Sequence, residues 1–158
     1  MADQLPITIR GKKKLEAELK KLIQQERPAV VRAIEEARAQ GDLSENADYD
    51  AAKEKQGWIE ARISEIQGRI AGAEVVDTSQ LSSDRVIFGA TVKLKDIDTD
   101  KEVSYQVVGP EEADISEGRL SIMSPLARSI IGKKVGDVAE LSTPQTQKDY
   151  EVIEIHFE

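Results

Sequence analysis

Apolar residues in the first quarter of the chain recur three or four residues apart, a spacing typical of an amphipathic helix. The positions are Leu15, Leu19, Leu22, Val30, Ile34 and Ala37. Thr8 precedes them as a plausible N-cap, and Gly41 is a helix stop signal. Pro28 interrupts the pattern, and a proline inside a helix costs roughly 3 kcal/mol. The spacing therefore predicts a helical segment with a kink, or a junction of two helices, near Pro28.

A second helical pattern follows almost at once and has the three-four alternation of a heptad seam. Its positions are Tyr49, Ala52, Gln56, Ile59, Ile63, Ile66, Ile70 and Ala73. We also assign Trp58 to the seam rather than to a binding role. Two helices of about 30 residues joined by a few residues must run antiparallel, each spanning on the order of 45 Å. A third element could cover this hairpin, but we favour a two-stranded rod because the rest of the chain reads as strands.

From about residue 80 the apolar period changes to two, which indicates strands. We expect strands over residues 86–94, 102–108, 138–141 and 150–157, with a turn over 96–100. Ser124-Pro125 is an N-cap followed by a first-turn proline, and it predicts a short helix that Gly132 ends. The fold class is thus α+β: an antiparallel coiled-coil hairpin over 1–77, a linker over 78–84, and a small antiparallel β domain with one short helix over 85–158.

The composition argues against several kinds of site and partner. The 158 residues include no cysteine and a single histidine, His156, which leaves almost no material for a thiolate or histidine metal site or a catalytic triad. The net charge of −8 disfavours a broad electrostatic grip on DNA or RNA. No apolar stretch approaches the roughly 20 residues that a membrane span needs.

Carboxylates gather at the predicted hairpin turn, residues 41–50: Asp42, Glu45, Asp48 and Asp50. One interpretation is a capping box, with Asp42 as N-cap and Glu45 at the third helical position. The other is that two carboxylates at the end of a thin rod bind a divalent metal such as Mg²⁺ or orient a water. Two carboxylates alone make a poor metal site, so a partner would have to supply the remaining ligands.

The segment over residues 37–53, Ala-Arg-Ala-Gln-Gly-Asp-Leu-Ser-Glu-Asn-Ala-Asp-Tyr-Asp-Ala-Ala-Lys, resembles the hairpin tip of the Gre family of bacterial transcript cleavage factors. The resemblance extends over essentially the whole chain. It includes Thr8-Ile-Arg-Gly-Lys, the strand Arg85-Val-Ile-Phe-Gly-Ala-Thr-Val, and Ile122-Met-Ser-Pro-Leu-Ala-Arg-Ser-Ile-Ile-Gly-Lys.

The resemblance implies a function. The hairpin would enter the secondary channel of RNA polymerase and stimulate the polymerase's own cleavage of the 3′ end of backtracked RNA, rescuing arrested complexes. An FK506-binding-protein-like (FKBP-like) C-terminal domain would dock on the channel rim. The protein would then be a cofactor protein rather than an enzyme, a cytoplasmic monomer that binds no cofactor alone and no membrane. It would meet the RNA 3′ end and the DNA template only through the polymerase complex.

The resemblance also assigns roles to residues. Asp42 and Glu45 carry the activity in trans, and we expect Asp42 to help hold a Mg²⁺ at the polymerase active site while Glu45 positions the attacking water. The tip-supporting residues are Arg38, Asn46 and Lys53, the last of which is arginine in many relatives. The polymerase-docking segment is Ser124, Pro125, Leu126, Ala127 and Arg128.

Two alternatives remain. The first is a polymerase-binding inhibitor of the same fold that lacks cleavage activity, against which the intact Asp-x-x-Glu of the tip argues. The second is a prolyl isomerase, which would need an aromatic-lined pocket, whereas the region after residue 80 offers only Phe88, Tyr105, Tyr150 and Phe157. Within the Gre family, the acidic balance favours the GreA subtype over the more basic GreB.

Overall fold

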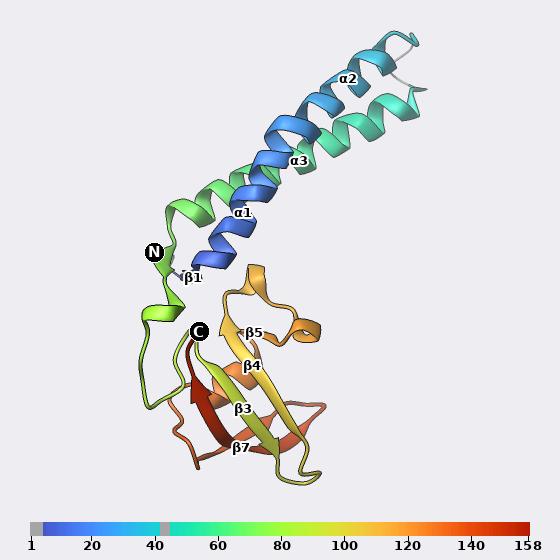
Figure 1. The fold of residues 1–158 in the computed structure, drawn as a ribbon. Helices are drawn as coiled ribbons and strands as arrows, with labels where there is room; N and C mark the ends of the chain where they lie inside the picture. The colour runs from blue at the N-terminus through green and yellow to red at the C-terminus, as the bar shows by residue number, and fades with distance from the viewer. Residues whose placement is uncertain (1–4, 42–44) are drawn as a thin grey trace. The chain divides into compact units, whose positions relative to one another are not determined.

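The computed structural model describes residues 5–41 and 45–158, and the chain divides into two compact units (Figure 1). One unit is Lys13–Ala73, and the other joins the residues up to Lys12 with Glu74–Glu158. The first unit is shorter than the hairpin expected over residues 1–77, because a short strand at each end belongs to the second unit.

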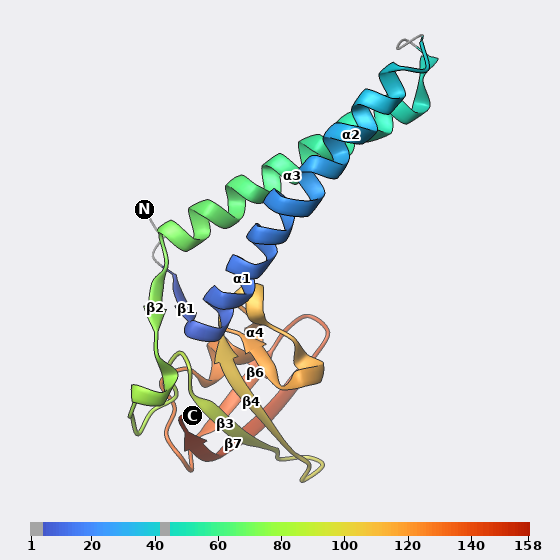
Figure 2. The ribbon, with the colours of Figure 1, turned by 45° about the horizontal axis from the view of Figure 1, so that its top comes forward.

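The first arm of the hairpin consists of α1 (Ile9–Lys21), a π-helical turn η1 (Leu22–Glu26) and α2 (Arg27–Arg38); the second arm is α3 (Ala47–Ala71). Figure 2 shows α2 and α3 side by side. Pro28 lies in the first turn of α2, where a missing N–H costs little, so the predicted helix junction is confirmed. From Leu22 to Val30 the buried positions are eight residues apart, one more than a heptad, and the wider π turn takes up the extra residue.

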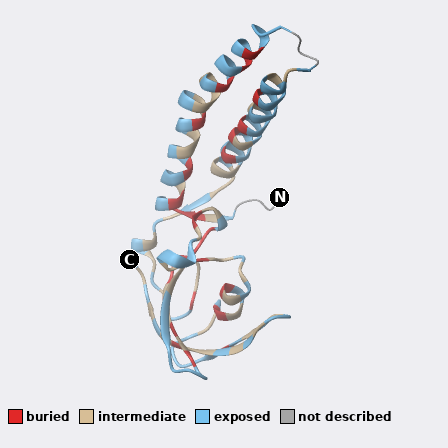
Figure 3. Ribbon diagram, turned by 90° about the vertical axis from the view of Figure 1, so that its right-hand side faces the viewer, coloured by how far each residue is buried: buried red, intermediate tan, exposed pale blue. Residues whose placement is uncertain are grey.

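The seam between the arms is made of aliphatic residues, and Figure 3 colours their buried positions red on the ribbon. The buried members are Leu15, Leu22, Val30, Ile34 and Ala37 on the first arm and Ala52, Ile59, Ile63 and Ile66 on α3. Burying one such large aliphatic side chain is worth about 1.5–3 kcal/mol. The assignment of Trp58 to the seam is wrong: its side chain is 60% exposed, because a residue beside Ile59 points about 100° away around the helix.

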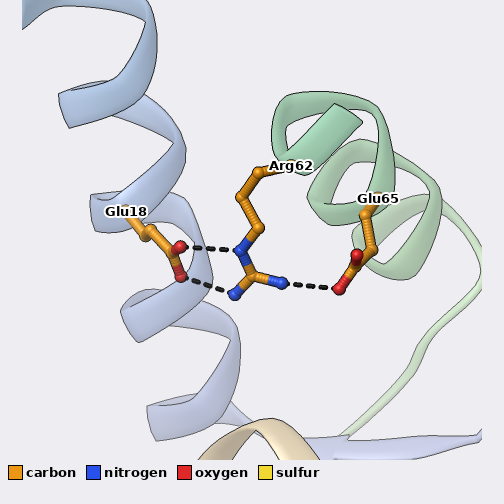
Figure 4. A network of polar contacts seen from close by, with 3 residues as sticks. All are labelled: Glu18, Arg62 and Glu65. Atoms are coloured by element: carbon orange, nitrogen blue, oxygen red, sulfur yellow. Dashed lines mark hydrogen bonds and ion pairs between the residues drawn. The ribbon is translucent and has the colours of Figure 1, made fainter. Parts of the chain in front are cut away.

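Ion pairs cross between the arms outside the seam. The Arg62 guanidinium donates from Nε and Nη2 to both carboxylate oxygens of Glu18, at 2.7 and 2.8 Å, and from Nη1 to Glu65 at 2.6 Å (Figure 4). Arg27 makes a similar two-point contact with Glu60, at 2.8 Å for both bonds. The hydrogen bond from Arg62 lowers the pKa of the Glu18 carboxyl. Exposed pairs of this kind contribute about 0–1 kcal/mol each, so the seam supplies most of the stability.

The second unit is built on a five-stranded sheet in the order β5-β4-β3-β7-β6. The strands are β3 (Thr91–Asp96), β4 (Glu102–Val108), β5 (Arg119–Ser121), β6 (Val138–Ser142) and β7 (Gln147–His156). The prediction of a purely antiparallel sheet is wrong at one edge, because β5 pairs with β4 in parallel. The predicted short helix is present as α4 (Pro125–Ile130), and its Ala127 and Ile130 are fully buried in the core that includes Val92, Leu94 and Val152.

A second, two-stranded sheet pairs β1 (Pro6–Thr8) with β2 (Glu74–Val76) in parallel, directly before α1 and soon after α3. Thr8 caps α1 as predicted, since its Oγ1 accepts a hydrogen bond from the Gly11 N–H at 2.9 Å. The same hydroxyl donates to the buried carboxylate of Glu112, in the 3₁₀ turn η4 (Pro110–Glu112).

The remaining 3₁₀ turns are η3 (Thr78–Gln80) and η5 (Ile115–Glu117). The Thr78 hydroxyl of η3 donates to the Glu158 carbonyl at 2.7 Å, so the segment expected as a linker is tied to the C-terminus of the chain. Within the described ranges, no helix combines the length and apolar character that crossing a membrane requires.

Candidate functional site at the hairpin tip

The tip connects the last residue of α2, Arg38, to the first residue of α3, Ala47. Gly41 takes a φ of 108°, a left-handed conformation that favours glycine, and its N–H donates to the Arg38 carbonyl at 3.2 Å. Residues 42–44 lie outside the described residues, and the candidate metal ligand Asp42 is among them. Of the two carboxylates singled out from the sequence, the structure therefore places only Glu45, which is exposed.

Asn46 connects the two arms at the tip. Its Oδ1 accepts a hydrogen bond from the Tyr49 N–H at 3.0 Å, which makes Asn46 the N-cap of α3. Its Nδ2 donates to the Ala37 carbonyl at 2.7 Å, in the last turn of α2, and that carbonyl also accepts from the Gln40 N–H at 3.1 Å. One amide side chain thus bonds to an N–H at the start of one helix and to a carbonyl at the end of the other.

This geometry corrects the capping-box interpretation. Because Asn46 is the N-cap of α3, Glu45 precedes the cap and does not occupy the third position of that helix. The acids in the first turn of α3 are Asp48 and Asp50, where carboxylates complement the helix dipole. The Glu45 carboxylate is consequently not used to cap α3.

Arg38 and Lys53 lie exposed on opposite arms behind the tip. Arg38 is in the last turn of α2, where a cation is favourable for the helix dipole. Lys53 donates to the side-chain oxygen of Gln56 at 3.3 Å, within its own helix. A supporting role for these two side chains at the tip stays a prediction.

A hollow of about 400 Å³ lies at the tip, lined by Gln40, Glu45, Asn46, Ala47 and Asp48. It brings three residues beside Glu45 and Asn46 that the sequence analysis did not assign to the site: Gln40, Ala47 and Asp48. For Asp48, the signal available in the sequence was its position three residues after Glu45. Across residues 5–41 and 45–158, no three His, Asp or Glu side chains are grouped closely enough to hold a metal ion.

The segment expected to dock on a partner forms the N-terminus of α4. Ser124 is its N-cap: the Oγ accepts from the Ala127 N–H at 3.2 Å and donates to the Ser121 carbonyl at 2.7 Å. Leu126 is half-buried against the core, and Ala127 is fully buried. The exposed members of this segment are therefore Pro125 and Arg128.

Comparison with known protein families covers nearly the entire chain. The family described as transcription elongation factor, N-terminal, matches residues 5–75, and the family described as transcription elongation factor, GreA/GreB, C-term, matches residues 81–157. The chain belongs to the GreA/GreB family of transcription elongation factors.

Two GreA relatives agree with this assignment. The chain is 54% identical over 155 residues to transcription elongation factor GreA of Phenylobacterium zucineum, covering 98% of this chain and 99% of that one. It is 57% identical over 149 residues to transcription elongation factor GreA of Ralstonia nicotianae, covering 94% of each. Among solved structures, GreA factor homolog 1 (Gfh1) of Thermus thermophilus matches 97% of the chain at 26% identity and a TM-score of 0.45.

The two GreA/GreB family matches divide the candidate residues between them. The tip hollow with Glu45, Asn46 and Asp48 falls within the N-terminal match, and the α4 segment falls within the C-terminal match. The resemblance inferred from the sequence is confirmed, and the chain is a transcription elongation factor.

Proposed function

We propose that this GreA/GreB-family factor stimulates the RNA-cleaving activity of RNA polymerase by presenting its acidic tip to the polymerase active site. In backtracked complexes the hairpin enters the secondary channel, and the polymerase removes the displaced 3′ end of the RNA. The observation that carries this proposal is the tip itself, where the Glu45 carboxylate is exposed and not used as the cap of α3.

In this proposal the factor supplies only part of the catalytic site. Phosphodiester hydrolysis with two metals needs carboxylates to hold the second ion and to orient the water. Asp42 supplies the metal ligand and Glu45 the contact to the water, while the polymerase supplies the Mg²⁺ and the remaining ligands. The factor is then no enzyme and holds no cofactor alone.

Docking is assigned to the C-terminal part of the chain. Pro125 and Arg128 are its exposed contact residues, Ser124 fixes the turn that presents them, and Leu126 and Ala127 anchor α4 in the core. We assign the docking role to an FKBP-like domain over 85–158, joined through 78–84 to the hairpin over 1–77. The factor acts as a cytoplasmic monomer at the channel rim and reaches the RNA 3′ end and DNA template only within the polymerase complex.

The test is RNA cleavage in stalled, backtracked complexes of purified polymerase, with saturating wild-type factor, Asp42→Asn or Glu45→Gln. We expect each variant to lose most of the stimulation while still binding, because an amide cannot replace the charge that holds Mg²⁺ or polarises a water. Asp50→Asn is the matched control, because it removes an acid from the same part of the hairpin. Wild-type cleavage rates with both tip variants would exclude the mechanism.

The same assay decides between cleavage stimulation and the alternative of a non-cleaving polymerase inhibitor. A wild-type factor that binds polymerase, produces no RNA fragments and slows elongation would establish the inhibitor. Factor alone, incubated with RNA and Mg²⁺ in the absence of polymerase, should release nothing.

A further inference from the structure

A groove runs between α2 and α3 next to the tip hollow and encloses about 400 Å³. Its apolar lining is almost entirely alanine: Ala29, Ala33, Ala37, Ala51 and Ala52, with Val30. Such small side chains leave room along the side of the hairpin where larger ones would fill it. Ala29, Ala33 and Ala51 are exposed, so the groove is open to a partner.

The charge along the groove is mainly negative. Glu36 on α2 and Asp48 on α3 line it from opposite arms, and both are exposed. Among the residues that the structure describes, neither carboxylate has an ion-pair partner. The one basic lining residue, Lys55, lies away from the tip and has its Nζ 4.0 Å from the Glu26 carboxylate. The end of the groove nearest the tip therefore repels phosphates and attracts a cation.

A long basic side chain matches this combination of methyl groups and carboxylates. Its aliphatic stem can lie along the alanines while its charged head stays near the acids. Arginine fits better than lysine, because the guanidinium presents N–H groups in several directions and can contact carboxylates on both sides.

We propose that the groove binds an arginine side chain of the protein that receives the hairpin, which under the proposed function is RNA polymerase. Gln40 and Asp48 line both the groove and the tip hollow. An arginine seated there therefore lies next to the tip hollow and strengthens the binding of the hairpin. The groove sets affinity, and the tip supplies the chemistry.

Two substitutions test the groove, each with a matched control. Glu36→Gln removes one groove charge, and Glu35→Gln removes the neighbouring exposed charge outside it. Ala33→Leu fills the groove, and Ala61→Leu adds the same side chain at an exposed position of α3 outside it. Circular dichroism shows whether the four variants keep their helix content.

The measurement is RNA cleavage in backtracked polymerase complexes as a function of factor concentration. For Glu36→Gln we expect the half-maximal factor concentration to rise about three- to fivefold, as for the loss of an exposed ion pair. The rise should be smaller at high salt, because salt screens the pair. For Ala33→Leu we expect a rise on the order of tenfold, as for blocking a filled interface pocket. The maximal rate at saturation should stay unchanged. Groove variants that match their controls would overturn the inference.

A photocrosslinker placed at residue 33 identifies the occupant. We expect it to react with a polymerase segment that contains an arginine, and the same probe at residue 61 should not react with that segment. Crosslinking of residue 33 to RNA, or to a segment without arginine, would contradict the proposal. A wild-type factor that neither binds polymerase nor stimulates cleavage would overturn the proposed function itself, which is a different result from a groove variant that equals its control.

Discussion

Replacing Asn46 by alanine should loosen the start of α3 by an amount that follows from its two hydrogen bonds. The bond from the Tyr49 N–H is an N-cap, and losing a cap of this type typically costs about 1 kcal/mol, with a range of about 0.5–2 kcal/mol. The bond to the Ala37 carbonyl adds about 0.5–1.5 kcal/mol. Because Asn46 is only half-buried and water can replace part of both bonds, we expect a total of about 1–2 kcal/mol.

Amide hydrogen exchange is the suitable measurement, because the loss is local to the tip. At about 1.4 kcal/mol per tenfold, the Tyr49 amide and its neighbours in the first turn of α3 should exchange roughly five to thirty times faster in Asn46→Ala. Amides near Ile63 and Ile66, in the buried seam of the same helix, serve as an internal reference and should keep their wild-type rates.

Two further variants separate the cap from the bond between the arms. Asn46→Ser keeps an oxygen acceptor for Tyr49 but cannot reach the Ala37 carbonyl, so it should lose only the second contribution. Asn46→Asp keeps the cap and turns an oxygen toward that carbonyl, so it should be less stable than Asn46→Ser at neutral pH. The reasoning is refuted if all three variants exchange at the wild-type rate, or if Asn46→Asp protects the tip best.

For three other substitutions, the structure predicts the direction in which folding stability changes. Gly57→Ala should stabilise the chain by about 0.5–1 kcal/mol in urea unfolding, because an added Cβ inside α3 meets nothing within 4 Å and alanine is the better helix former. Gly11→Ala should destabilise it by about 1–2 kcal/mol in the same assay, because the new Cβ would lie 2.8 Å from the buried Glu112 carboxylate. The hydrogen bond from Arg62 lowers the pKa of Glu18 in the folded state. The pair therefore contributes stability above the ordinary pKa of 4.5 and loses it as the pH falls through the lowered value. Over this acid range, the melting temperature should depend less on pH in Glu18→Gln than in the wild type.

The hairpin was the most predictable part of the fold, because a heptad seam is a long-range pattern with many repeats. The junction at Pro28 followed from the chemistry of proline alone. Trp58 was misplaced because hydrophobicity, not its position in the heptad, suggested burial, and it stands one residue out of register with Ile59. The N-cap was misassigned because Asp42 and Asn46 are both good caps by type, and only the hydrogen bond to Tyr49 decides between them.

The second unit was predicted less completely, for reasons of length and distance. β1, β2 and β5 have three residues each, too few for alternation to be visible, and two of the pairings are parallel. The polar segment after Asp77 gave no sign that Thr78 bonds to the other end of the chain. The α4 cap at Ser124-Pro125 was correct because that signal is local.

The π-helical turn η1 determines where the hairpin can gain or lose a single residue. Removing one residue elsewhere in the first arm would rotate everything beyond it by about 100° around the helix axis and turn the seam away from α3. Between Leu22 and Val30 a deletion would instead restore a spacing of seven and let the turn close into continuous α-helix, once Pro28 is replaced by a residue with an N–H. Length differences of one residue among relatives should therefore concentrate at this turn, and engineered hairpins can be shortened there without redesigning the seam.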